Sequence, residues 1–343
     1  MGGSKPSKVL YSVPVTQPKQ GETAVYRNID HKDALVSKPR SGVTTMQEIF
    51  THRFKNSPKD NFLGQRPRKA DNKNELEEYF EWETWSQVEE LSKALGSGIT
   101  HMKLIPNRKQ FRDYDLKFIA IYGKNSREWI LTDIACTIFG ITSIPIYDTL
   151  GEEATDYMFN QTELTTCFLT CSHVAGILKR MAANAVPHLT NIVVMDEWNL
   201  TTELTDSVKS NPKITLIKFS DIISKGRENM IALPVVKPND VYIFSYTSGT
   251  TGLPKGAMIS HKNMIAGLGG MELAVEVNNP VHLSYLPLAH VFERVMLSWT
   301  VIKGGTYGVF NGDVLKLKDD LAILKPTIFP SVPRLYNKFY DKI

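Results

Sequence analysis

The chain of 343 residues has little of what marks several protein classes. Its three cysteines, Cys136, Cys167 and Cys171, are too few for a disulfide framework and match no zinc-ligand spacing, which favours a reducing compartment. Its charge-free apolar stretch at 134–147 is too short to span a bilayer. Structural-zinc and membrane-spanning classes are therefore excluded.

An excess of one charge is also missing. Lys and Arg number 40 against 36 Asp and Glu, and this net charge of +4 is too small and dispersed to favour nucleic-acid binding. Hydrophobic residues make up 42% and charged residues 22%, as in a soluble globular protein with a large core. The length predicts two or three compact units.

We expect three segments along the chain. Residues 1–75 read as a polar N-terminal arm, residues 76–235 as a first α/β subdomain, and residues 236–343 as an incomplete second one that carries a glycine-rich loop. Between His52 and Lys73 there are seven basic and two acidic residues. This basic stretch favours a solvated arm over the first subdomain, and contact with an anionic membrane surface is the alternative.

Apolar runs and helical rows alternate along the chain after position 80. Short apolar runs between turns predict strands, and apolar residues three or four apart predict helices. The expected strands cover 118–122, 142–146, 166–169, 191–195, 214–219, 241–246, 281–286 and 327–329, with helices near 130–139, 152–159, 174–183, 262–273 and 291–302. This alternation predicts an α/β fold with stacked, mostly parallel sheets flanked by helices.

Regular structure is expected to begin near Glu81 with a helix that has its own end signals. Thr84 or Ser86 can cap its start, since Ser86 and Glu89 have the spacing of a capping box. Gly96 stands where a glycine commonly ends a helix.

One loop carries the strongest chemical signal. An apolar strand at 240–246 runs directly into Thr247-Ser-Gly-Thr-Thr-Gly-Leu-Pro-Lys-Gly256. Its glycines allow close backbone approach, and its hydroxyls and amides can surround phosphate oxygens. It is not a Walker A loop, because Gly256 follows Lys255 where that motif needs Ser or Thr.

Together with Tyr246, this loop resembles the phosphate-binding signature of the adenylate-forming (AMP-binding) superfamily. Four other stretches resemble long-chain fatty-acyl-CoA synthetases of the eukaryotic type. They are Asn125-Ser-Arg-Glu-Trp129, Ile146-Tyr-Asp-Thr-Leu-Gly151, Tyr285-Leu-Pro-Leu-Ala-His-Val-Phe-Glu-Arg294 and Pro326-Thr-Ile-Phe-Pro-Ser-Val-Pro-Arg-Leu-Tyr336. The similarity runs from about Asn61 to the last residue.

The resemblance implies a two-step ligase reaction. A long-chain fatty carboxylate attacks the α-phosphorus of ATP to give an acyl-adenylate, and the thiolate of coenzyme A then displaces AMP. Charge that builds on the phosphoryl oxygens must be neutralised, by Mg²⁺ and a lysine. The resemblance assigns ATP-phosphate binding to Thr247, Ser248, Gly249, Thr250, Thr251, Gly252 and Lys255, with Thr247 also a candidate Mg²⁺ ligand.

The resemblance adds His290 to Lys255 as a catalytic candidate. It implies that His290 lines the pocket near the adenylate and the acyl carboxyl, whereas its strand-to-helix position alone favours a helix cap. Glu293 and Arg294 next to it are expected to form a structural ion pair. The pattern Cys167-x3-Cys171-x-His173 is too sparse to predict a metal site.

Three segments of the resembling family find no counterpart here: a Gly-x-Thr-Glu segment, a Thr-Gly-Asp segment and a carboxy-terminal domain with a catalytic lysine. Asn311-Gly-Asp313 looks similar to the second, but it precedes the place of the first. We therefore expect the amino-terminal portion of a ligase, inactive alone. The alternative is a non-catalytic product that binds ATP or acyl chains or acts through protein contacts.

Partners and location follow from the same resemblance. The expected partners are a long-chain fatty acid, ATP, Mg²⁺ and coenzyme A, with no nucleic acid. Membrane contact, if any, would be peripheral and would follow from the apolar substrate. The expected place is the cytoplasmic side, free or on the surface of the endoplasmic reticulum or another organelle.

Overall fold

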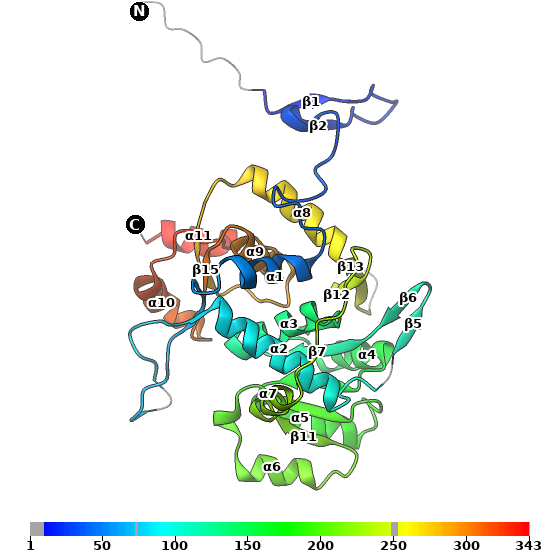
Figure 1. Ribbon diagram of the computed structural model, residues 1–343, viewed down its shortest axis with the longest axis vertical. Coiled ribbons are helices and arrows are strands. Elements are labelled where there is room, and N and C mark those ends of the chain that lie inside the picture. Colours follow the sequence, from blue (N-terminus) through cyan, green and yellow to red (C-terminus); the bar gives the residue numbers. More distant parts are fainter. Residues whose placement is uncertain (1–9, 73–74, 107, 248–252, 343) are drawn as a thin grey trace, which may run out of the picture.

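A seven-stranded sheet forms the centre of the computed structural model, which describes residues 10–72, 75–106, 108–247 and 253–342 (Figure 1). Its strand order is β11-β10-β9-β7-β8-β12-β13. The strands are β7 (Phe118–Tyr122), β8 (Thr142–Ile146), β9 (Thr166–Leu169), β10 (Asn191–Val194), β11 (Thr215–Lys218), β12 (Val241–Thr247) and β13 (Lys255–Ser260). All neighbours are parallel except β12 and β13, which are antiparallel. The expected α/β fold is confirmed.

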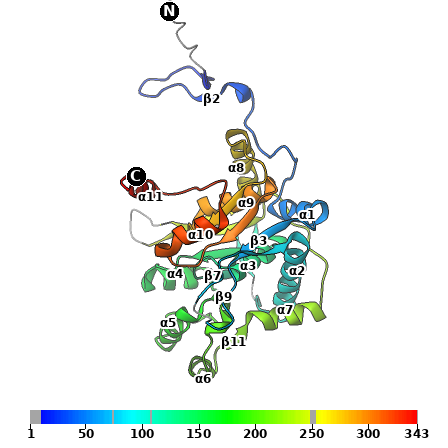
Figure 2. The same cartoon turned by 90° about the vertical axis from the view of Figure 1, so that its left-hand side faces the viewer.

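A second sheet combines strands from distant parts of the sequence. Its order is β14 (Val281–Ser284), β15 (Thr306–Val309), β3 (Asn61–Gln65) and β4 (Glu81–Thr84). Only β3 and β4 are antiparallel. Two small hairpins are formed by β1 (Ser12–Pro14) with β2 (Tyr26–Asn28) and by β5 (Lys109–Phe111) with β6 (Tyr114–Leu116). The first stands away from the rest of the molecule in both ribbon views (Figures 1 and 2).

Helices cover both faces of the larger sheet (Figure 2). One face carries α4 (Glu152–Thr162), α5 (Cys171–Ala182) and α6 (Thr202–Lys209), and the other carries α1 (Met46–Asn56), α2 (Trp85–His101), α3 (Arg127–Ile138) and α7 (Phe219–Glu228). Buried α3 contacts β7 and β8 of the larger sheet and β3 of the smaller one. The remaining helices are α8 (His261–Ala274), α9 (Val291–Ile302), α10 (Leu317–Leu324) and α11 (Pro333–Tyr340).

Most expected strands and helices are present, with informative exceptions. The bounds of β7, β8, β9 and α9 agree with the sequence prediction. The strand expected at 327–329 is wrong, since Ile328 makes only an isolated bridge to His282. Pro326 and Pro330 flank this segment and cannot donate backbone hydrogen bonds, so a longer ladder does not form.

The sequence predicted the N-cap of α2 as one of two residues, but it predicted the wrong C-terminal end. Thr84 is its N-cap, in a capping box with Gln87, so the box expected for Ser86 and Glu89 is wrong. The helix also continues through Gly96 to His101. Helix α2 packs closely on α7, where a Cβ atom on Gly98 would lie 2.1 Å from the Ile222 carbonyl oxygen. Gly98 therefore permits close packing of α2 on α7, and Gly96 does not end the helix.

The N-terminal 75 residues contribute more to the core than expected. Regular structure packed on the core begins at Met46 in α1, well before Glu81, and α1 starts with a capping box of Thr45 and Glu48. The basic stretch is partly internal: the Arg53 Nε donates to the Val301 carbonyl at 2.7 Å, and Arg66 pairs with fully buried Asp320 at 2.8 Å. The solvated interpretation is wrong for these two arginines.

Candidate functional site

The end of the β12–β13 hairpin holds the described part of the predicted phosphate loop. Thr247 on β12 is the register partner of Lys255 on β13, and its Oγ1 donates a long 3.5 Å bond to the Lys255 carbonyl. Both residues are exposed. The other predicted phosphate-binding residues, Ser248, Gly249, Thr250, Thr251 and Gly252, lie outside the described residues. The strands thus bring Thr247 and Lys255 together at the mouth of the loop.

Strand alternation fixes the face to which these two side chains belong. The Tyr246 hydroxyl donates to Gln161 of α4 at 2.5 Å, so Tyr246 lies on the α4 face of the sheet. Adjacent strand residues point to opposite faces, and directly paired residues share a face. Thr247 and Lys255 therefore share the face on which α3 and α9 pack.

Glycine is required beside this pair for a packing reason. A Cβ atom on Gly256 would lie 2.1 Å from the Phe244 ring, so a side chain there would displace Phe244. This close approach holds β13 against β12 directly beside Lys255.

His290 is the N-cap residue of α9. Its Nδ1 accepts from the Phe292 backbone N–H at 3.1 Å, which is the capping role that its sequence position favours. Because Nδ1 is an acceptor, the ring proton is on Nε2. The side chain is exposed, so Nε2–H can donate to a ligand. Among the described residues, no hydrogen bond joins His290 to Thr247 or Lys255.

Asn125, which follows β7 of the larger sheet, is hydrogen-bonded to the segment of the smaller sheet that precedes His290. Its Nδ2 donates to the carbonyls of Ser284 and Leu286, at 3.3 and 2.7 Å, and its Oδ1 accepts from Leu288 N–H at 2.8 Å. This buried amide thus holds the segment that leads from β14 into the His290 cap. The sequence stretch that contains Asn125 marked the family resemblance, but it did not reveal this role.

Arg294 anchors α9 to the larger sheet. It is 1% exposed and forms an ion pair with Asp133 of α3, which is equally buried. Its Nη2 also donates to Ser143 of β8 at 2.9 Å and, more weakly, to Tyr242 of β12 at 3.4 Å. Burial is the largest single effect and opposes the charge, but the interactions with the Asp133 carboxylate and with Tyr242 together outweigh it and raise the pKa of Arg294. Arg294 therefore stays charged inside the core.

Glu293 anchors the same helix to the smaller sheet. Its Oε1 accepts from His282 Nε2 of β14 at 2.8 Å and from the hydroxyl of Tyr307 of β15. The ion pair expected between Glu293 and Arg294 is thus wrong, because each of these consecutive residues has its partners on a different sheet. On a helix, adjacent side chains diverge by about 100° and do not face each other.

Resident metal ligands are sparse in this part of the protein. No cluster of three or more His, Cys, Asp or Glu side chains placed to hold a metal occurs among the described residues. Mg²⁺ prefers about six oxygen ligands, largely phosphates and water when it accompanies a nucleotide. The exposed Thr247 hydroxyl can supply one such oxygen, which fits an Mg²⁺ ion whose other ligands are phosphates and water.

The cysteine and histidine side chains near α5 are not arranged as metal ligands. His173 Nε2 pairs with Asp148 Oδ1 at 2.7 Å, and the imidazole stacks on Tyr122 with ring centres 3.8 Å apart. Cys167 and Cys171 are free and buried. Burial raises the pKa of both thiols, that of Cys171 to about 12 with help from nearby Asp196, so neither thiolate forms at neutral pH.

Helix composition also bears on membranes. Among the helices of the described residues, none combines the length and the apolar character that a bilayer crossing needs.

The fold is that of adenylate-forming enzymes. The adenylation–carrier didomain of a carboxylic acid reductase from Segniliparus rugosus, solved with AMP, superimposes with a TM-score of 0.72 at 23% identity, over 89% of this chain and 46% of that one. A long-chain-fatty-acid–CoA ligase (FadD1) from Archaeoglobus fulgidus gives 0.62 at 17% identity, over 85% and 51%. At these identities the likeness establishes the fold.

Sequence comparison identifies the family. The model of the AMP-binding enzymes matches residues 64–342, so the chain belongs to the AMP-binding enzyme family. Long chain acyl-CoA synthetase 7, peroxisomal, of Arabidopsis thaliana is 34% identical over 326 residues, 94% of this chain and 44% of that protein. Long-chain-fatty-acid–CoA ligase 1 of Homo sapiens is 35% identical over 308 residues, 88% and 41%. The chain spans less than half the length of these relatives.

Proposed function

We propose that this chain is the portion of a long-chain fatty acid–CoA ligase that binds the phosphates of ATP. In the overall reaction, a fatty carboxylate displaces pyrophosphate from ATP, and the thiolate of coenzyme A then displaces AMP from the acyl-adenylate. The observation that carries the proposal is the Thr247–Lys255 pair at the mouth of the loop, in a chain similar to long-chain acyl-CoA synthetases.

Lys255 supplies positive charge where the nucleotide carries the most negative charge. Lys255 is the first residue of β13, and its side chain lies on the same sheet face as the Thr247 hydroxyl. A lysine at the outer phosphates offsets the charge that hinders the approach of an anionic carboxylate. Mg²⁺ bound with ATP supplies further charge neutralisation.

His290 is proposed to meet the reacting carboxyl. Its Nδ1 is committed to the α9 cap, so its Nε2–H is oriented by the helix and can donate to a carboxylate oxygen. The three anchors described above fix that helix start: Asn125 before it, Glu293 to the smaller sheet and Arg294 to the larger. A donor held this way needs little reorganisation when substrate binds.

Nucleotide titration of the purified chain tests the role of Lys255. With Mg²⁺ present, Lys255→Ala should weaken ATP binding about tenfold, the order expected for one lost charge contact, and leave AMP binding nearly unchanged. Exposed Lys262 provides the matched control, and Lys262→Ala should bind both nucleotides as the unmodified chain does. Equal weakening of ATP and AMP binding by Lys255→Ala would remove Lys255 from the outer phosphates.

Catalysis by this chain alone is a separate question. Since it matches less than half of its relatives, we expect purified residues 1–343, given palmitate, ATP and Mg²⁺, to form no detectable acyl-AMP. Chromatography of a reaction with labelled ATP measures this directly. Labelled acyl-AMP at a rate above that of Lys255→Ala would show that residues 1–343 suffice for the first step.

A further inference from the structure

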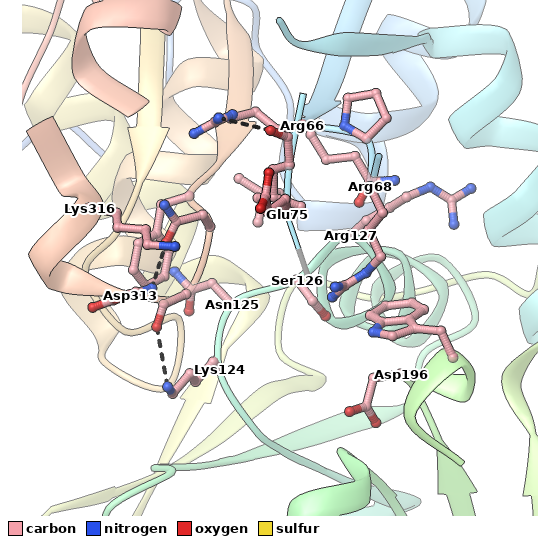
Figure 3. Close-up of a pocket in the computed structure, with 18 of the residues that line it drawn as sticks. Arg66, Arg68, Glu75, Lys124, Asn125, Ser126, Arg127, Asp196, Asp313 and Lys316 are labelled. Carbon is pink, nitrogen blue, oxygen red and sulfur yellow. Dashed lines mark hydrogen bonds between the residues drawn. The ribbon is translucent and has the colours of Figure 1, made fainter. Parts of the chain in front are cut away.

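A cleft of about 750 Å³ opens at the carboxyl ends of the parallel strands (Figure 3). It is lined by the segments that follow β7, β9 and β10 in the larger sheet and β3 and β15 in the smaller one. Thr247, Lys255 and His290 are not among its lining residues. A volume of this order suits a small organic ligand.

The strand order gives a reason for a cleft at this place. From β7 the chain enters α3 on one face of the sheet, whereas from β9 it enters α5 on the other face. The loops after adjacent β7 and β9 therefore diverge and leave a crevice between them. In open α/β sheets, ligands bind in such a crevice at the carboxyl edge. Asn125 and Ser126 after β7 and Thr170 after β9 all line this cleft.

Positive groups converge on the cleft from three segments. Arg68 comes from the segment after β3, Lys124 and Arg127 from the start of α3, and Lys316 from the segment after β15. Figure 3 shows Lys124 and Lys316 on one side and Arg68 and Arg127 on the other. Arg127 is already paired with Glu83 and Glu128. Exposed Lys124 donates to the Gly312 carbonyl at 3.2 Å, a contact that a phosphate oxygen can replace.

The start of α3 adds a further positive end to these side chains. This helix has 12 residues, and its N-cap Ser126 lines the cleft. Its first backbone N–H groups carry the positive end of the helix dipole, which favours a phosphate group. Asp313 lines the same side, and the helix start, Lys124 and Lys316 together outnumber its single negative charge, which makes this side of the cleft suitable for a phosphate group (Figure 3).

Other lining residues suit the rest of a nucleotide. The Trp198 ring is 45% exposed and lies 4.7 Å below the Arg68 guanidinium, so an aromatic face borders the cleft. Six carboxylates line the cleft against six arginines and lysines, and these carboxylates are Glu75, Glu78, Glu128, Asp196, Asp313 and Asp319. Bare phosphate would be repelled by them, whereas ribose hydroxyls and the amino group of a base can donate to them. The mixed lining therefore favours a nucleotide over an inorganic anion.

We propose that this cleft is a second nucleotide site, separate from the Thr247–Lys255 pair. The phosphates bind Lys124, Lys316 and the start of α3, and the base packs beside Trp198. The proposal goes beyond the ligase function and stands without it, because none of the described loop residues, Thr247 and 253–256, lines the cleft.

Calorimetric titration in the Lys255→Ala background tests the site, because that change weakens binding at the loop. ADP should bind this chain more tightly than pyrophosphate does. Lys124→Ala and Lys316→Ala should each weaken ADP binding about three- to tenfold, and higher salt should weaken it further. Exposed Lys209 on α6 is the matched control, and Lys209→Ala should bind ADP normally.

Two further comparisons separate the parts of the ligand. Trp198→Ala, at a half-exposed position, should weaken ADP binding and leave pyrophosphate binding unchanged. Comparing adenosine 3′,5′-bisphosphate with ADP tests whether the site prefers the second phosphate on the ribose or on the 5′ chain. Tighter binding of either nucleotide than of pyrophosphate supports the site. Pyrophosphate binding as tight as that of both nucleotides, or ADP affinity unchanged in both lysine variants, would overturn it.

Discussion

A buried histidine makes the stability of this chain depend on pH. His261, the first residue of α8, is 2% exposed. Its Nδ1 accepts from the Met46 backbone N–H of α1 at 3.1 Å, so the imidazole must be neutral to make this bond. Burial lowers its pKa from 6.5 to about 4, although nearby Asp240 acts in the opposite direction. The bond joins the N-terminal 75 residues to the hairpin region.

The sign and size of the effect follow from this pKa. The unfolded chain binds a proton at His261 more readily than the folded chain, so protonation favours unfolding. The contribution is fully present above pH 6.5 and is lost as the pH falls toward 4. The complete shift corresponds to about 3 kcal/mol of unfolding free energy, of which about 2 kcal/mol is lost by pH 5.

Urea unfolding at pH 7, 6 and 5 measures this contribution. His261→Asn keeps an acceptor near the Nδ1 position but cannot titrate, so its unfolding free energy should fall by about 2 kcal/mol less than that of the unmodified chain between pH 7 and 5. Exposed His52 is the matched control, and His52→Asn should retain the full pH dependence. The same slope for His261→Asn and the unmodified chain would refute the reasoning.

Two further predictions concern the core. Arg294→Met leaves the Asp133 carboxylate buried without its partner and should lower the unfolding free energy by about 3–5 kcal/mol. The double variant with Asp133→Leu should recover most of this loss, and urea unfolding measures both variants. A double variant no more stable than Arg294→Met would contradict the ion-pair argument. Gly226→Ala places a Cβ atom 1.7 Å from the Ala94 carbonyl oxygen and should lower the melting temperature through a loss of about 3 kcal/mol. Gly176→Ala, at an exposed position of α5 with no atom within 4 Å, should stabilise the chain by up to about 1 kcal/mol. Equal melting temperatures for these two variants would argue against close packing of α2 on α7.

The fold class could be predicted because the strands of the larger sheet are buried on both faces. Strands β7, β8 and β9 are wholly buried, and their sequences are short apolar runs with clear ends. By contrast, β13 is an edge strand of mixed polarity and β15 is a four-residue strand behind two glycines, so neither has a period to detect. The hydrophobic pattern reports burial, and short or edge strands carry little of it.

The site was predictable to the extent that its residues are close in sequence. Thr247 and Lys255 belong to one motif, and their pairing across the hairpin follows from an antiparallel return. The clamp of Asn125 on the Ser284–Leu288 segment and the pair of Arg294 with Asp133 join residues far apart in the chain. Single-sequence patterns contain no information on such long-range partners, so both roles required the structure.

The smaller sheet has a consequence for folding. Strand β3 pairs with β15, so a segment near the amino terminus must find one that emerges from the ribosome more than two hundred residues later. Such sequence-distant pairing costs chain entropy before it gains stability, which slows folding. During synthesis, the backbone of β3 facing β15 therefore has no strand partner until residue 309 has been made, and chaperones that shield exposed strands would act in this interval.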